Sequence, residues 1–286
     1  MNVLLLGATG YLGGNIAAKL VDEGHHVICV VRSTSDFSRL DMMGNNIELI
    51  SSSVDQIELT LKRGKVDWVI NAVCTYKPNE TLYGDMLNSN VMFPLSVLNL
   101  AVKYHVSNFL TIGTGLPDDF NVYSFTKHSL SEFGHFISLK EKINFIDLQL
   151  EMFYSGMFEP SNRFLKDCFL RLSRGEKVQL TEGNQRRDII RVEDVVAIIS
   201  LLVDKNIFAG YNLLPLGSGE QHSIRDILTF MKDYMKSPSE LDFGAIKSRE
   251  NEPDTCADIK WLNKINYTLE YGYWEGLEEY CKRKDR

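Results

Sequence analysis

The sequence lacks the patterns that would indicate a metal centre, a disulfide framework or a membrane span. Its five cysteines are odd in number and widely spaced, and they form no CxxC pair. Neither a disulfide framework nor a zinc site is therefore predicted, and the six histidines show no metal-ligand spacing either. No apolar run reaches membrane-spanning length, and the N-terminal MNVLLLGATG has no charged n-region of a signal peptide. We expect a cytoplasmic protein with no metal and no membrane partner.

A concentration of positive charge is also missing. The net charge is −7 and the basic residues are scattered, whereas a nucleic-acid binder needs a basic face. The composition is that of an ordinary globular protein, with 44% hydrophobic and 24% charged residues. A chain of 286 residues can bury a large core, either as one α/β unit or as two lobes.

The first half of the chain alternates strand-like with helix-like segments. Such alternation predicts βαβ units around a mostly parallel sheet, a Rossmann-type doubly wound α/β fold. The expected strands are 2–7, 26–32, 47–50, 67–73, 108–113 and 143–151, and the expected helices are 11–24, 55–63, 88–105 and 122–140. After about residue 151 the alternation becomes irregular. We therefore expect a Rossmann domain over 1–151 and a smaller mixed lobe over 152–286, with some segments returning to the first domain.

The first strand leads into a glycine-rich turn, GATGYLGG, at residues 7–14. Gly7, Gly10 and Gly13 allow a tight turn, a close approach to a pyrophosphate and close packing of the following helix on its strand. The helix N-terminus offers free N–H groups and a positive dipole end to phosphates. A strand before the turn and an amphipathic helix after it are the context that a dinucleotide-binding motif requires.

The end of the second strand distinguishes NADP from NAD. An NAD site needs an acidic residue there to accept from the ribose 2′-hydroxyl, but this chain has VVRSTSDF. Arg32 could pair with a 2′-phosphate, and Ser33 and Ser35 could add hydroxyl donors. We therefore predict NADP(H), with Asp36 as the residue that could still reach the ribose and favour NAD.

The segment VYSFTKHSLSEF places a tyrosine and a lysine four residues apart, on one face of an expected helix. A tyrosine near its ordinary pKa of about 10 is a poor proton donor at neutral pH, and a neighbouring cation lowers that pKa. Tyr123 and Lys127 thus form a candidate acid catalyst with the charge that tunes it. Thr114, after the fifth strand, could hydrogen-bond a substrate carbonyl oxygen, and Thr111 competes with it for this role.

GATGYLGG, Thr114 and Tyr123-Ser-Phe-Thr-Lys127, in this order, resemble the extended short-chain dehydrogenase/reductase superfamily. The resemblance implies that Tyr123, Lys127 and Thr114 are catalytic and that Lys127 also holds the nicotinamide ribose. It implies a set of cofactor contacts that includes the two catalytic side chains on the helix. That set is Gly7, Thr9, Gly10, Tyr11, Leu12, Gly13, Arg32, Ser33, Ala72, Val73, Cys74, Asn90, Tyr123 and Lys127.

The second half of the chain resembles the substrate-binding part of the same superfamily. QRRDIIRVEDV matches a segment whose arginine contacts a nucleotide sugar, here Arg187, and FGAIKSRENEPDTCADIKWL supplies a second phosphate-binding arginine, Arg249. Met152 stands where many members have asparagine, with Glu151 before it, so contacts at 152 are not carried over. The substrate-binding residues implied are Tyr76, Thr114, Glu151, Phe164, Arg187 and Arg249.

Within the superfamily, the short connection between Thr114 and Tyr123 and the segments LTEGNQRRD and FGAIKSRENE are similar to the CDP-paratose and CDP-abequose synthases of O-antigen synthesis. The resemblance implies NADPH-dependent reduction of the 4-keto group of a CDP- or dTDP-linked 6-deoxy or 3,6-dideoxy sugar. An NAD-dependent nucleotide-sugar epimerase and a non-catalytic NADP-sensing regulator remain as alternatives. A homodimer in which helices 88–105 and 122–140 form a four-helix interface, as in many relatives, is a further hypothesis.

Overall fold

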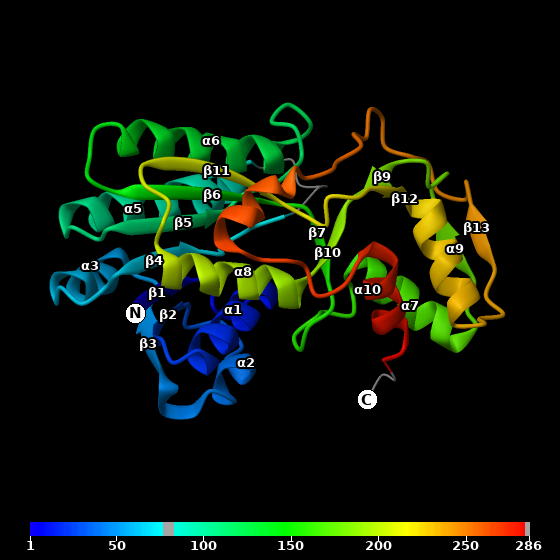
Figure 1. Cartoon of the computed structure of the whole chain (residues 1–286), viewed down its shortest axis with the longest axis horizontal. Coiled ribbons are helices and arrows are strands. Elements are labelled where there is room, and N and C mark those ends of the chain that lie inside the picture. Colours follow the sequence, from blue (N-terminus) through cyan, green and yellow to red (C-terminus); the bar gives the residue numbers. More distant parts are fainter. Residues whose placement is uncertain (77–82, 284–286) are drawn as a thin grey trace. The chain divides into compact units, whose positions relative to one another are not determined.

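The structure, a computed structural model, describes residues 1–76 and 83–283. It divides into two compact units, one comprising Met1–Leu150 with Val196–Leu214 and the other Glu151–Val195 with Pro215–Arg286. Figure 1 shows the elements of both units. The assignment of cofactor binding to the first unit and of substrate binding to the second stays a prediction.

The first unit is built on a seven-stranded sheet in the order β11-β6-β5-β4-β1-β2-β3 (Figure 1). The five strand pairs from β6 to β3 are all parallel. The strands are β1 (Asn2–Leu6), β2 (His26–Val31), β3 (Ile47–Ser51), β4 (Trp68–Asn71), β5 (Asn108–Ile112), β6 (Asn144–Leu150) and β11 (Tyr211–Leu216). The expected Rossmann-type sheet is thereby confirmed, with a strand from late in the chain added at its edge.

Helices cover both faces of this sheet. On one face Leu4 and Leu6 join a buried cluster with α3 and α5, while Val3 and Leu5, which point the other way, are equally buried. The helices are α1 (Tyr11–Asp22), α2 (Ser38–Asp41), α3 (Val54–Lys62), α4 (Gly84–Leu87), α5 (Phe93–Lys103), α6 (Val122–Ser138) and α8 (Val192–Lys205).

The helix expected over 88–105 begins earlier and is not uniform. It consists of α4, a π-helical turn at Asn88–Met92 and then α5, with Pro94 in the first turn of α5. A proline in a first turn removes no intrahelical hydrogen bond. The π-turn places an extra residue within the helix, and such turns are frequent at functional sites.

The second unit has short strands of mixed direction, as expected for the smaller lobe. β10 pairs in parallel with β7 and β13 with β8, whereas β12 pairs antiparallel with β9. Its strands are β7 (Met152–Tyr154), β8 (Val178–Leu180), β9 (Arg186–Arg187), β10 (Ile189–Arg191), β12 (His222–Ser223) and β13 (Leu241–Phe243). Its helices are α7 (Phe164–Arg174), α9 (Ile224–Tyr234) and α10 (Tyr273–Cys281), and their apolar faces form one core.

Candidate active site

The glycine turn is so tightly packed that side chains are excluded from it. Gly7 has φ +82°, and a Cβ there would lie 2.9 Å from the backbone carbonyl of Ala72. A Cβ on Gly13 would lie 2.1 Å from the carbonyl oxygen of Gly7. Gly10 is the N-cap of α1 and provides no side-chain cap, so the first-turn N–H groups are available to an anion. This cradle fits the pyrophosphate of a dinucleotide.

The loop after β2 carries Arg32 and Ser33, the residues predicted to contact a 2′-phosphate, and both are exposed. Asp36, the residue that could have favoured NAD, accepts a hydrogen bond from the backbone N–H of Ser38 at 2.9 Å. This bond holds the pKa of Asp36 below its ordinary value. The Ser35 hydroxyl oxygen is buried and, within the described part of the chain, has no partner. The Asp36 carboxylate thus binds the start of α2, and the Ser35 hydroxyl is left able to form a hydrogen bond.

Sequence reasoning missed Arg39. Its Nη1 donates to the carbonyl oxygen of Thr9 at 2.8 Å, so the loop after β2 is tied to the glycine turn. The only sequence signal was a second cation after Arg32, and nothing local indicates a partner thirty residues earlier in the chain.

Helix α6 presents Tyr123 and Lys127 from a well-capped N-terminus. Asn121 and Ser124 form a capping box, in which the Asn121 side chain accepts from the Ser124 N–H at 2.9 Å and the Ser124 hydroxyl accepts from the Asn121 N–H at 3.1 Å. Tyr123 is therefore in the first turn, and Lys127 follows one turn later. Lys127 is only 4% exposed, which is rare for a lysine.

The ring of Tyr76 lies against that of Tyr123, with ring centroids 5.1 Å apart and planes at 88°. Edge-to-face packing of this kind is a favourable arrangement of two aromatic rings. Tyr76 is 47% exposed, so the pair has an accessible side. Two residues predicted for separate roles are thus neighbours.

The two competing threonines differ in what their hydroxyls contact. Thr111 lies within β5, and its Oγ1 accepts from the side-chain amide of Asn71 at 3.0 Å. Thr114 follows the end of β5, where its Oγ1 accepts from the Leu116 N–H at 3.3 Å. The Leu116 carbonyl oxygen is 2.8 Å from Nε2 of His128, so this short connection is fixed to α6 one residue past Lys127.

Asn90, predicted as a cofactor contact, is fully buried in the π-turn. Its amide nitrogen donates to the Thr75 carbonyl and to the Thr126 hydroxyl, both at 3.1 Å, and its oxygen accepts from the Thr75 N–H at 2.8 Å. Asn90 therefore joins the segment after β4 to α6. A cofactor contact for this side chain stays a prediction.

In the second unit, Arg187 is already engaged by the protein. Its Nη2 pairs with a Glu252 carboxylate oxygen at 2.5 Å, and its Nη1 donates to the carbonyl oxygens of Pro253 and Arg186. Glu252 lies three residues after Arg249. Arg187 thus fixes the segment that carries the other predicted arginine, and substrate contacts of either stay predictions.

Glu151 follows β6 and is a carboxyl group in surroundings that disfavour its charged form. Burial raises its pKa to about 7; the Asp188 charge adds to this, while a Thr255 hydrogen bond and the Arg187 charge oppose it. Glu151 and Arg187, predicted separately as substrate contacts, are thus close enough to interact. Phe164, the first residue of α7, is 42% exposed.

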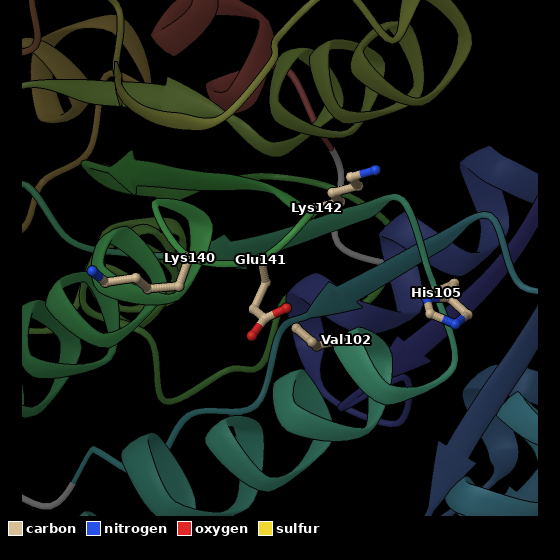
Figure 2. Close-up of a pocket in the computed structure, with 5 residues that line it drawn as sticks. All are labelled: Val102, His105, Lys140, Glu141 and Lys142. Atoms are coloured by element: carbon tan, nitrogen blue, oxygen red, sulfur yellow. The ribbon is translucent and has the colours of Figure 1, made fainter.

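A cavity of about 280 Å³ occurs at the other end of the sheet. Val102, His105, Lys140, Glu141 and Lys142 line it, just before the strands β5 and β6 begin. Figure 2 shows Lys140 and Lys142 pointing away from each other, so their charges do not converge on one ligand. The strand ends after which the glycine turn and Thr114 follow are at the opposite edge, because parallel strands share a direction.

Comparison with known proteins extends these observations to nearly the whole chain. Residues 3–213 match the model of the NAD dependent epimerase/dehydratase family. The chain belongs to this family. The family uses nicotinamide cofactors, and its members are oxidoreductase- or epimerase-type enzymes of nucleotide sugars.

Individual relatives and solved structures of family members agree with that assignment. The chain is 29% identical over 300 residues to CDP-abequose synthase from Salmonella typhimurium, covering 98% of this chain and 97% of the relative. It is 21% identical over 276 residues to CDP-abequose synthase from Yersinia pseudotuberculosis, covering 92% and 94%. UDP-glucuronic acid 4-epimerase from Bacillus cereus, solved with UDP-glucuronic acid and NAD, has the same fold with a TM-score of 0.84 at 19% identity, covering 99% of each chain.

UDP-glucose 4-epimerase from Thermotoga maritima, solved with UDP-glucose, gives a TM-score of 0.83 at 18% identity, covering 99% of this chain and 98% of that one. The two solved epimerase structures support the fold described for this chain. Among the described residues, no helix is both long and apolar enough to cross a bilayer.

Proposed function

We propose that this protein reduces the 4-keto group of a nucleotide-linked deoxysugar with NADPH. The observation that carries the proposal is the helix α6, which buries Lys127 one turn after Tyr123 while its His128 fixes the connection that begins at Thr114. The similarity to CDP-abequose synthases over nearly the full length supports a 4-keto-6-deoxy or 3,6-dideoxy sugar linked to CDP, with dTDP as the alternative base.

Each residue has a distinct part in this reaction. NADPH, when bound, supplies a hydride to the carbonyl carbon. The Thr114 hydroxyl donates to the carbonyl oxygen and orients it. The Tyr123 hydroxyl gives its proton to that oxygen as negative charge develops there. Lys127 stabilises the resulting phenolate, because an ammonium one turn away favours the charged form of the phenol.

The proposal includes the substrate-binding residues predicted from the sequence. Tyr76 would provide an aromatic surface beside Tyr123, and Glu151, Phe164, Arg187 and Arg249 would bind the nucleotide sugar. Arg187 has five N–H donors, of which its two backbone acceptors and Glu252 use three. It therefore keeps donors for a diphosphate.

The NADP(H) preference is supported by the loop after β2. Arg32 and Ser33 are exposed, and Asp36 is occupied with the start of α2. Isothermal titration with 2′,5′-ADP and with 5′-ADP tests this without a substrate. We expect tighter binding of 2′,5′-ADP and loss of that difference in Arg32→Met; equal binding of both by the parent would overturn the preference.

Measuring NADPH oxidation with a panel of CDP- and dTDP-linked 4-keto sugars tests the reaction. We expect turnover with at least one, lowered about 10²- to 10⁴-fold in Tyr123→Phe. Tyr104→Phe is the matched control, because its hydroxyl contacts Glu58 at 2.8 Å, away from the proposed site. An epimerase would instead purify with tightly held NAD and consume no cofactor. A non-catalytic regulator would turn over none of the panel.

We also propose a homodimer in the cytoplasm, built on α6 and its neighbours. The exposed apolar side chains of α6 are Phe125, Phe133 and Phe136, its C-cap Leu139 is also exposed, and those of the adjoining turns are Leu87 and Met92. An exposed apolar face of this kind marks an interaction surface. Light scattering should give twice the chain mass for the parent and the chain mass for Phe133→Glu/Phe136→Glu.

A further inference from the structure

Arg39 makes a contact that joins two separate parts of the predicted cofactor site. Its Nη1 donates to the carbonyl oxygen of Thr9 at 2.8 Å. Thr9 lies in the glycine turn, where the Gly10 N–H donates to the Gly7 carbonyl oxygen at 3.0 Å. Arg39 adds to this turn a bond from α2, thirty residues later in the chain. None of the roles assigned so far uses this arginine.

Two further hydrogen bonds fold the loop after β2 upon itself. The Ser35 N–H donates to the Arg32 carbonyl oxygen at 2.9 Å. The Asp36 carboxylate accepts from the Ser38 N–H, also at 2.9 Å. Both bonds begin and end within residues 32–38, so they shape the loop without determining where it lies relative to the glycine turn. The bond from Arg39 does determine this, because its acceptor belongs to the turn.

Helix α2 gives Arg39 a fixed base. Leu40, the next residue, is only 1% exposed, and Met43, two residues after the end of α2, is also buried. Burial of these apolar side chains holds α2 on the first unit. The guanidinium of Arg39 is planar and rigid, so a bond that it forms from this base restricts the segment between the two ends.

The glycine turn and the loop after β2 leave the sheet side by side. β1 and β2 are parallel neighbours in which Leu6 is paired with Val30, so the segments that follow them start at the same edge. In a dinucleotide-binding fold the first segment contacts the pyrophosphate, and the second contacts the adenosine ribose or its 2′-phosphate. The bond from Arg39 therefore connects the two parts of the chain that would hold these groups.

We propose that Arg39 is a positioning residue for the 2′-phosphate of NADP(H), acting through the loop that carries Arg32 and Ser33. The proposal deepens the proposed NADP(H) preference and rests on it. The bond to Thr9 holds this loop beside the glycine turn before the cofactor binds. A loop that is already ordered binds a ligand more tightly, because binding does not have to offset the entropy of ordering it.

Loss of the bond should be felt by the 2′-phosphate and not by the rest of the nucleotide. The glycine turn is fixed by its own close packing, as the positions of Gly7 and Gly13 show, so it does not depend on Arg39. Arg39→Met keeps an apolar stem and has no N–H donor. In this variant we expect the affinity for 2′,5′-ADP to fall about tenfold and that for 5′-ADP to change less than about twofold.

Isothermal titration of both ligands measures the two affinities. Equal weakening of 2′,5′-ADP and 5′-ADP would indicate a general structural role, and no change in either would show that the bond has no part in binding. Either result would overturn the proposal. Arg39→Gln, whose amide ends two bonds short of the guanidinium nitrogens, removes the same bond with a polar side chain. It decides the question if the methionine variant does not fold.

The Arg32→Met background separates positioning from direct contact with the phosphate. Changes to two residues that act as a unit are not additive. If Arg39 acts through the loop that carries Arg32, Arg39→Met should alter the ratio of the two affinities in the parent and leave it unaltered in Arg32→Met. A further fall of the ratio in that background would show that Arg39 acts on the phosphate by itself, and the positioning role would be wrong.

Hydrogen exchange of the protein without ligand tests the restraint directly. The amides of residues 32–38 should exchange about tenfold faster in Arg39→Met, because the loop then opens more easily. Unaltered exchange over these residues would contradict the proposal, whatever the affinities. This measurement requires neither cofactor nor substrate, so it does not depend on the reaction.

Arg63→Met is the matched control, because it removes the same charge elsewhere in the first unit. Nη1 of Arg63 is 3.0 Å from Oε1 of Glu48, near the start of β3 and thus at the opposite edge of the sheet. It should alter neither the ratio of affinities nor the exchange of residues 32–38. If the parent binds both ligands equally, the NADP(H) preference is wrong and the proposal with it. If the parent prefers 2′,5′-ADP and Arg39→Met keeps that preference, only the role of Arg39 is wrong.

Discussion

Each unit of this protein buries one aspartate against a glycine, and the two are treated differently by their surroundings. Asp188 in the second unit accepts from the Ser218 N–H and hydroxyl, both at 2.6 Å, and from the N–H groups of Gly219 at 3.0 Å and Ala257 at 3.1 Å. Asp147 in the first unit accepts from Ser131 alone within the described part of the chain.

Asp188 therefore holds chain segments together through its hydrogen bonds, whereas Asp147 has an oxygen that could accept a further hydrogen bond. Asp188 lies between β9 and β10, and its four hydrogen bonds join this part of the chain to the 217–219 turn and to residue 257. Asp147 lies in β6, and Ser131 connects it to α6. Burial raises the pKa of both carboxyls, so it is the number of donors that distinguishes them.

The largest expected effect is that of Asp188→Ala. Four donors lose their acceptor at once, and unsatisfied buried groups that faced a charge are costly, so we expect the free energy of unfolding to fall by about 3–5 kcal/mol. Urea denaturation followed by circular dichroism measures this. Asp147→Ala should cost less, and an equal or larger loss there would contradict the comparison.

The two glycines provide the next test. A Cβ on Gly217 would lie 2.2 Å from Oδ2 of Asp188, as close as the Gly113 position is to Asp147. Overpacking of this kind costs about 1–3 kcal/mol, and we expect Gly217→Ala at the upper end because Asp188 is held by four bonds. Only Gly113→Ala, next to Thr114, should also lower kcat. A kcat loss in both alanine variants would remove the functional distinction.

A third buried acid, Glu151, extends the comparison to pH. Its pKa of about 7 exceeds its unfolded value of 4.5, so the folded state binds the extra proton between these values. Stability contributed by the protonated form is therefore present below about pH 4.5 and is lost as the pH rises through 7, by about 3 kcal/mol. Glu151→Gln should flatten this part of the stability profile. An unchanged slope in that variant would assign the dependence to other groups, Asp188 first.

The smallest effect is expected from the two serines. Ser218→Ala removes one of four bonds to Asp188, whereas Ser131→Ala removes the one described hydrogen bond to Asp147. We expect losses of about 1 and 2 kcal/mol respectively in the free energy of unfolding. Parallel urea titrations of the two variants test the order, and the reverse order would show that donor number does not govern these sites.

Local patterns predicted the sheet and the glycine turn well. GATGYLGG follows a buried strand and opens α1, as expected, because Gly7 and Gly13 are required by contacts within a few residues or with the adjacent strand. The Ser223 cap of α9 was equally predictable, since its hydroxyl accepts from the Asp226 N–H three residues later. Periodicity and capping are local, and a single sequence reports them directly.

The features that the sequence did not reveal depend on distant partners. INFIDLQLE was interpreted only as a strand, because nothing near Asp147 indicates that Ser131 and Gly113 meet it. The bond from Arg39 to Thr9 and the ion pair of Arg187 with Glu252 are missed for the same reason. Residue spacing along one element cannot show which element lies opposite.

Strand β11 adds to the sheet beside β6 although residues 151–195 of the second unit, and then most of α8, lie between them in the chain. When only the first 150 residues have been synthesised, the sheet therefore has an open border at β6, where backbone N–H and C=O groups lack their strand partner. Until Tyr211–Leu216 emerges, that border is free to pair with other nascent chains. Early truncations of this protein should consequently aggregate, even though they contain every residue proposed for proton transfer.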